Sequence, residues 1–154
     1  MSEGKKLWGG RFKAPADAHF AGFNNSFAFD VRLLEADVEA SRAYCGALLR
    51  AAVITSEDAA AIHRGLETIL QKSQSDPAYL LGTDVEDVHS FVEARLVELI
   101  GEAGKRLHTG RSRNDQVSTD FRLWVRKAID SLHDQSRDTQ TALLEFAEEN
   151  RAVV

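Results

Sequence analysis

The sequence divides at residues 109–116, which read Thr109-Gly110-Arg111-Ser112-Arg113-Asn114-Asp115-Gln116. The stretch lies between a helical region of ordinary length and one long helical pattern that continues to the end of the sequence. Guanidinium groups, side-chain amides and the free N–H groups of a helix N-terminus can together bind a small anion. The alternative is a polar loop in which Ser112 or Asn114 only caps the following helix. The stretch thus predicts the start of a helix and offers a candidate anion site.

The residues after this stretch predict one very long helix, because no glycine or proline interrupts them. Polar residues occupy 134–140, and apolar residues recur at helical spacing on both sides of them: Val117, Phe121, Trp124, Val125, Ala128, Ile129, Leu132, Leu143, Phe146 and Ala147. A helix over residues 112–151 would be about 60 Å long. Its apolar stripe is too long to be buried by shorter helices. We therefore expect it to pair with long helices of a second copy or of residues outside this sequence.

The residues before the stretch predict three shorter helices. The first is expected to run from Asp30, as its N-cap, to about Ala52. Its apolar side comprises Leu34, Val38, Ser41, Cys45, Leu48 and Leu49. The second is expected to begin at Thr55, where Asp58 resembles the second residue of a capping box. It fades at residues 73–76.

The third helix is expected to start near Asp84 and Asp87 and to end at Gly101 and Gly104. The predicted fold class is therefore all-α. The domain boundaries that we expect are an N-terminal arm over 1–29, a small helical domain over 30–108, and the start of a central helical bundle over 109–154.

The N-terminal arm is rich in aromatic residues, which disordered tails usually lack. Its motif Leu7-Trp8-Gly9-Gly10-Arg11-Phe12 is followed by Phe20, Phe23, Phe27 and Phe29. We expect the arm to pack on another part of the protein. Asn24, Asn25 and Ser26 interrupt the phenylalanines and are typical of a turn.

Composition indicates a soluble globular protein, with 44% hydrophobic and 28% charged residues. The net charge of −5 argues against general nucleic-acid binding. A single cysteine, Cys45, leaves no internal disulfide and no thiolate cluster for a metal, and we expect it to be a buried structural thiol. The sequence offers no secretory signal and no run of about 18 apolar residues that could span a membrane. The expected location is the cytoplasm.

Positive charge is concentrated around the dividing stretch. Seven Lys or Arg and three acidic residues lie between Gly101 and Lys127, in a chain whose net charge is negative. Such a local excess suits a small polycarboxylate or phosphate. Some of these cations could belong to a solvated helix face. The prediction of an anion site therefore depends on Arg111 and Arg113.

His89 borders the apolar stripe of the third predicted helix, with Glu86 and Glu93 as neighbours on the same face. It is either a hydrogen-bonded histidine at the edge of the core or a group that exchanges a proton near neutral pH beside a carboxylate.

Three motifs together resemble the argininosuccinate lyase family of the fumarase/aspartase/δ-crystallin superfamily. They are Leu7–Phe12, Glu86-Asp87-Val88-His89, and Leu107-His108 with the stretch Thr109–Gln116 and Val117. The resemblance follows the order of the whole chain. It implies a reversible β-elimination that splits argininosuccinate into L-arginine and fumarate during arginine biosynthesis, without a metal or other cofactor.

The resemblance also implies site residues. Ser26, Arg113 and Asn114 match substrate contacts of the family, with Arg113 and Asn114 holding a substrate carboxylate. Arg111 on the same loop and Asp30, placed to meet a cationic group, are further candidates. His89 matches a histidine that lines the family active site, in an orienting or proton-relaying role.

The catalytic histidine and serine of the family lie in a Thr-His segment and a Ser-rich loop, which the resemblance places after residue 154. The chain thus resembles an N-terminal domain with the first long helix of the central bundle. The family assembles as a homotetramer whose active sites take residues from three subunits. By this resemblance the partners are argininosuccinate, arginine and fumarate, with no nucleic acid and no membrane.

Other functions remain open at this point. One is another lyase of the superfamily, acting on adenylosuccinate or aspartate. A second is a structural, non-catalytic protein like δ-crystallin, which shares the motifs. A third is a helical oligomerisation module, which would leave Arg111 and Arg113 without a purpose.

Overall fold

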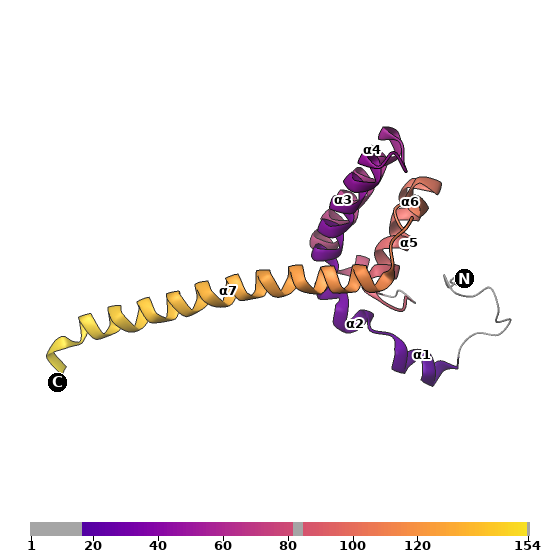
Figure 1. Ribbon diagram of the computed structural model, residues 1–154. Helices are drawn as coiled ribbons and strands as arrows, with labels where there is room; N and C mark the ends of the chain where they lie inside the picture. The colour runs from indigo at the N-terminus through magenta and orange to yellow at the C-terminus, as the bar shows by residue number, and fades with distance from the viewer. Residues whose placement is uncertain (1–16, 82–84, 154) are drawn as a thin grey trace.

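The computed structural model describes residues 17–81 and 85–153. All regular elements within these ranges are helical (Figure 1), which confirms the prediction of an all-α fold. The motif Leu7–Phe12 and Asp84, predicted as a helix-starting residue, lie outside the described residues.

The small domain is built from three helices that each contact the other two, with a short fourth helix beside them. They are α3 (Leu34–Arg50), α4 (Ser56–Ser75), α5 (Val88–Ile100) and α6 (Glu102–Arg106). Shorter elements precede and connect them: α1 (Ala18–Asn24), α2 (Phe27–Asp30), and the 3-10 helices η2 (Val31–Leu33) and η3 (Pro77–Leu80).

The predicted apolar stripes form the core of this domain. Burial is nearly complete for Val38, Cys45, Ile62, Leu66, Ile69, Val88, Phe91 and Leu96. Cys45 is a buried free thiol, as predicted, and burial raises its pKa. Leu49 was expected in the stripe but is 37% exposed, whereas its neighbour Leu48 is buried.

The caps of the helices agree with the sequence at two positions and differ at one. Thr55 and Asp58 form the predicted capping box of α4. Asp87 caps α5 by accepting a 2.6 Å hydrogen bond from the backbone N–H of Ser90. The prediction that Asp30 caps α3 is wrong, because Asp30 is the last residue of α2 and η2 separates it from Leu34. Asp30 binds the start of α5 instead.

The aromatic residues of the arm differ in how far they are buried. The ring of Phe27 packs on Phe91 of the core, with centroids 5.1 Å apart. Phe20, Phe23 and Phe29 are largely exposed. The expectation that this arm packs on another part of the protein is therefore confirmed within the described residues only for Phe27.

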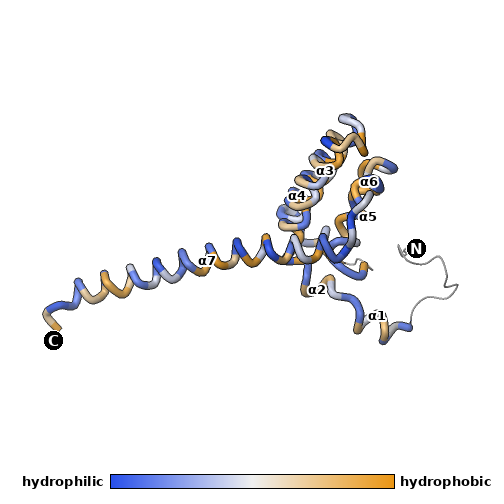
Figure 2. The backbone as a smooth tube through the Cα atoms, in the orientation of Figure 1, coloured by the Kyte–Doolittle hydropathy of each residue, from blue (hydrophilic) through white to orange (hydrophobic). Residues whose placement is uncertain are grey.

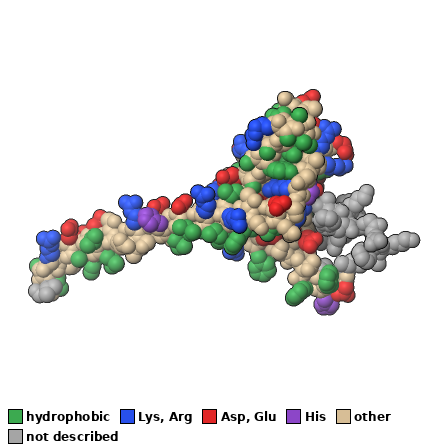
Figure 3. All heavy atoms as spheres, viewed as in Figure 1, with side chains coloured by type: hydrophobic (Ala, Val, Ile, Leu, Met, Phe, Trp, Pro, Cys, Tyr) green, Lys and Arg blue, Asp and Glu red, His purple; other side chains and the backbone are tan. Residues whose placement is uncertain are grey.

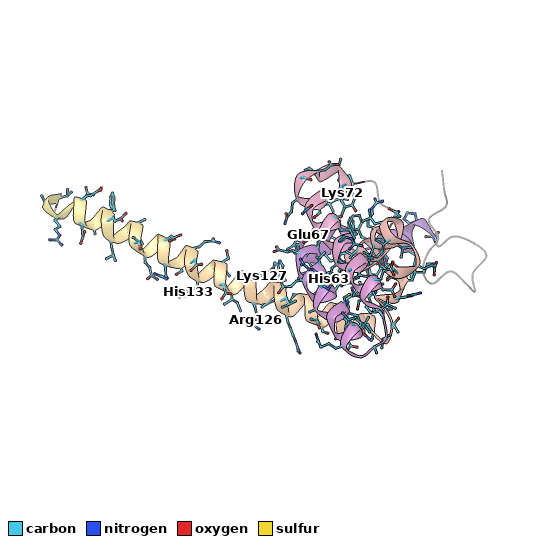
Figure 4. All side chains as sticks on the ribbon, turned by 90° about the horizontal axis from the view of Figure 1, so that it is seen from above. His63, Glu67, Lys72, Arg126, Lys127 and His133 are labelled. Carbon is cyan, nitrogen blue, oxygen red and sulfur yellow. The ribbon has the colours of Figure 1, made fainter. Side chains whose placement is uncertain are left out.

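The long helix α7 (Arg113–Glu149) is continuous over 37 residues, or about 55 Å, as predicted. Its first turns pack on α3, and the remainder extends away from the small domain (Figures 1 and 2). Lys127 ends the contact region with salt bridges of 3.1 Å to Glu35 and 3.0 Å to Glu39, whereas His133 lies further out on the free part (Figure 4).

The free part of α7 exposes its apolar stripe, which is visible as hydrophobic side chains along the helix in Figure 3. Ile129, Leu132, Leu143, Leu144 and Phe146 are each 58–67% exposed. No other described helix covers them. The prediction that the small domain cannot bury this stripe is confirmed. None of the described helices is long and apolar enough to cross a membrane.

Gly104 of α6 tests how tightly α5 and α6 pack. A Cβ atom added there would lie 3.1 Å from the backbone N and Cα of Val97, which cannot move as a side chain can. We predict that Gly104→Ala lowers the free energy of unfolding by about 1–3 kcal/mol, measured by urea denaturation. Gly46→Ala is the matched control, because the added methyl meets only the end of the Arg50 side chain, at 3.4 Å. The control should be neutral or stabilising by up to about 1 kcal/mol. Equal stabilities of the two variants would contradict this packing.

Candidate active site

The dividing stretch is held against α3 by one aromatic side chain. The hydroxyl of Tyr44 donates a 2.7 Å hydrogen bond to the carbonyl of Thr109, and its ring lies 5.2 Å from the guanidinium carbon of Arg111. Arg111 also donates to the hydroxyl of Ser41 at 3.1 Å. Gly110 between them has a φ of +71°, a conformation that a residue with a Cβ rarely adopts. The turn therefore directs Arg111 onto α3.

The end of the stretch forms the start of α7. Ser112 is the N-cap, since its hydroxyl accepts a 3.2 Å hydrogen bond from the backbone N–H of Asn114. Of the two capping residues considered from the sequence, Ser112 is thus the one used. The side chain of Asn114 is exposed in the first turn of α7 and is available to a ligand there.

Arg113 is fixed by two acceptors from different helices. Its Nη2 lies 3.0 Å from a carboxylate oxygen of Glu93 on α5. Its Nη1 donates a 2.7 Å hydrogen bond to the side-chain oxygen of Gln116, one turn further along α7. The guanidinium is therefore oriented while its side chain remains 19% exposed.

His89 lies in a buried cluster with two carboxylates from other helices. Its Nδ1 is 3.2 Å from Asp37 Oδ1 of α3 and 3.2 Å from Asp120 Oδ2 of α7. The amide nitrogen of Gln116 donates to the same oxygen of Asp37. His89 is 2% exposed, and Asp37 and Asp120 are fully buried. The carboxylates expected beside His89 were Glu86 and Glu93, so this part of the prediction is wrong.

Burial and mutual contact shift the pKa values of all three side chains in the cluster. Burial alone would lower the pKa of His89, but its close contacts with the carboxylates of Asp120 and Asp37, and their charges, raise it to about 9. Burial raises the pKa of Asp120 to about 6, and the neighbouring Asp37 adds to this effect against the opposing influence of His89. Burial works against ionisation of Asp37 too, yet the hydrogen bonds from His89 and Gln116 and the charge of His89 keep its pKa lowered. His89 is therefore an imidazolium at neutral pH, and Asp37 is its ionised partner.

The same three side chains have the chemistry of metal ligands. One ligand atom from each lies within 4.8 Å of the others, and Asp37 Oδ2 and both Asp120 oxygens lack a hydrogen-bond donor among the described residues. Sequence alone does not reveal this group of side chains, because helices distant in the chain bring the three residues together. A metal would bind neutral imidazole, and the raised pKa of His89 opposes the loss of its proton. A proton and a metal ion would therefore compete for these three side chains.

A second cluster joins Ser26 and Asp30 to the start of α5. The hydroxyl of Ser26 donates a 2.6 Å hydrogen bond to Asp30 Oδ2, and its backbone N–H donates to the carbonyl of Glu86 at 2.8 Å. Asp30 Oδ1 accepts from the backbone N–H of Val88 at 3.0 Å. Val88 and His89 are consecutive, so both clusters are anchored at one end of α5.

A cavity of about 20 Å³ lies between the turn and the buried cluster. Its lining includes Ser41, His89, Glu93, Arg111, Arg113 and Gln116, whereas Ser26 and Asp30 of the second cluster do not line it. It has room for about one water molecule and is far smaller than the pockets of several hundred Å³ that bind small molecules. A substrate would need further walls from outside the described residues.

The sequence interpretation identified Arg111, Arg113 and His89 but gave no role to Asp37, Asp120 or Gln116. The signal for these residues was present in the pattern of each helix. Asp37 lies beside Val38 on the side of α3 that faces the core, and Asp120 follows Gln116 by one helical turn. Acidic residues on a buried face need a partner, and that need points to His89.

A comparison with known protein families identifies the family of this chain. Residues 10–154 match the family model described as lyase. The chain belongs to this lyase family, which is part of the fumarase/aspartase superfamily. The lyase part of the resemblance is thereby confirmed.

The raised pKa of His89 predicts a stability that depends on pH. A group whose pKa is higher in the folded state than in the unfolded state stabilises the fold fully below the unfolded value, here 6.5. That contribution is lost as the pH rises through about 9. We predict that the free energy of unfolding falls by on the order of 2–3 kcal/mol over this range, measured by urea denaturation.

The control for this experiment is a matched pair of substitutions. His89→Gln should abolish the fall, because glutamine carries no titrating proton. His133→Gln should retain it, since His133 is exposed on the free part of α7. A fall of equal size in both variants would assign the pH dependence to other groups.

The raised pKa of His89 predicts that the cluster does not respond to divalent cations at neutral pH. We expect the melting temperature at neutral pH to remain the same after EDTA treatment and after addition of equimolar zinc. A zinc-dependent rise that is lost in Asp120→Asn would show instead that the cluster binds metal.

Proposed function

We propose that this protein is an argininosuccinate lyase, which splits argininosuccinate reversibly into L-arginine and fumarate in the cytoplasm during arginine biosynthesis. The observation that carries the proposal is the segment Thr109–Gln116, whose sequence is specific to that branch of the superfamily. Its Arg113 is oriented at the start of a long helix, in a chain that belongs to the lyase family.

The proposed role of this segment is to bind a substrate carboxylate. The exposed part of the Arg113 guanidinium, the side chain of Asn114 and the N–H groups of the first turn of α7 are donors for an anion. Arg111 contributes positive charge from behind, where Ser41 and Tyr44 hold it. Ser26 and Asp30 are proposed to contact another part of the substrate, with Asp30 facing a cationic group.

A β-elimination requires hydrogen-bond donors that are fixed in place around the substrate carboxylate. A base removes the proton from the carbon beside a carboxylate, and an acid assists departure of the guanidino nitrogen. The intermediate gathers negative charge on that carboxylate, so donors that are already oriented stabilise the transition state. The contacts of His89 with Asp37 and Asp120 support the orienting role for this histidine, because its Nδ1 is committed to the buried carboxylates.

We further propose that the protein acts as a homotetramer with active sites shared between subunits. The exposed apolar stripe of α7 supports this proposal, because it requires long helices as partners. The small size of the cavity beside Arg113 also supports it, since other segments would have to complete the substrate pocket. The serine and Thr-His segments that the resemblance requires would come from residues beyond these 154.

We predict that the purified 154-residue chain releases no fumarate from argininosuccinate, whereas the complete protein does. In the complete protein, Arg113→Lys should lower kcat/KM by about 100-fold, because lysine cannot present the planar donors of a guanidinium. The measurement is a fumarate-release assay with argininosuccinate, adenylosuccinate and aspartate as alternative substrates.

Arg122→Lys is the control for this assay, since Arg122 is exposed on α7 and lies outside the proposed site. Release of fumarate from adenylosuccinate or aspartate alone would assign the protein to another lyase of the superfamily. No turnover of any of the three substrates by the complete protein would favour a structural role like that of δ-crystallin.

A further inference from the structure

We propose that Gln116 is a positioning residue that fixes the guanidinium of Arg113 for carboxylate binding by connecting it to the buried Asp37. This inference rests on the proposed function in one respect, namely that Arg113 receives a carboxylate. The connection itself follows from the contacts of four side chains on three helices.

The first contact defines how Arg113 is held. A guanidinium has five N–H donors in one plane. Glu93 accepts at Nη2 and Gln116 accepts at Nη1, so two points on different nitrogens fix the orientation of the plane. Three N–H donors then remain on a guanidinium whose plane is fixed, and a bidentate contact with a carboxylate requires such a plane.

The second contact defines which way the amide of Gln116 faces. Its oxygen accepts from Arg113, and its nitrogen donates to Asp37 Oδ1. Reversing the amide would place the NH₂ group against the guanidinium and the oxygen against the carboxylate, and both contacts would be repulsive. Gln116 is 5% exposed, so water cannot relieve them. The amide therefore has one permitted orientation, and only a side chain with an acceptor and a donor at this length satisfies both neighbours.

The third contact fixes Asp37 itself. Its Oδ1 lies 3.2 Å from His89 Nδ1 and also accepts from Gln116, so one oxygen receives donors from α5 and α7. Asp37 is fully buried in α3. The position of Arg113 is thus set by a series of hydrogen bonds that begins in the core of the small domain. A shift of Asp37 or loss of the amide would release one of the two points that hold the guanidinium.

The test compares Gln116→Met with wild type in the complete protein. Methionine has a similar length but neither accepts nor donates at these positions. We expect the KM for argininosuccinate and the dissociation constant of fumarate to rise about tenfold, while kcat changes by less than about twofold. A crystal structure of the variant should show the Arg113 guanidinium in more than one orientation. A role of Gln116 in stability alone would not separate KM from kcat in this way.

Gln135→Met is the matched control, because Gln135 is exposed on the same helix and its side chain donates a hydrogen bond to the nearby Ser131 of that helix, far from the site. If Gln116→Met does not fold, Gln116→Asn provides the same comparison, since it retains the amide but is one methylene too short to reach both neighbours. An unchanged KM and fumarate affinity, or a single wild-type orientation of Arg113 in the variant, would overturn the inference. If wild type does not turn over argininosuccinate, the proposed function fails. The orientation of Arg113 and the affinity for fumarate then still decide the role of Gln116.

Discussion

The buried contact of His89 with Asp37 and Asp120 joins the three helices on which the candidate site is built. Each residue comes from a different helix, and none can be solvated by water. Two carboxylates in one buried cluster require compensating positive charge, which the imidazolium supplies. This requirement fixes α7 against α3 and α5 at the point where the helix begins. The placement of Gln116, one turn before Asp120, and of Arg113, two turns before it, depends on this contact.

The small domain holds one part of the candidate site rigidly, although the pocket of that site is incomplete. The clusters around His89 and Asp30 are anchored at consecutive residues of α5, and the turn at Gly110 is held by Tyr44 of α3. The donors of Arg113 and Asn114 thereby lie on a rigid helix start. Beyond the contact region α7 has no partners among the described residues, and its apolar stripe is open. Long helices packed on α7 would both cover this stripe and complete the pocket beside the fixed donors.

Local signals in the sequence were sufficient for most of the fold. The capping box at Thr55, the cap at Ser112 and the absence of any helix breaker after it determined α4 and α7, because these features act within one turn. Asp30 was misread because its short-range environment resembles a cap, whereas its actual partner, the N–H of Val88, is 58 residues away. The carboxylates of His89 were misread for the same reason. Neighbours on one helix are visible in the sequence, but Asp37 and Asp120 meet His89 only after three helices have packed.

The charge of His89 is the most direct test of this account. The ¹⁵N chemical shifts of its imidazole ring, measured by NMR at about pH 8, report whether one or both ring nitrogens carry a proton. We expect both nitrogens to be protonated at that pH, as a cation between two carboxylates requires. A neutral ring would contradict the account, because the buried cluster would then lack the positive charge that holds α7, and with it Arg113, in place.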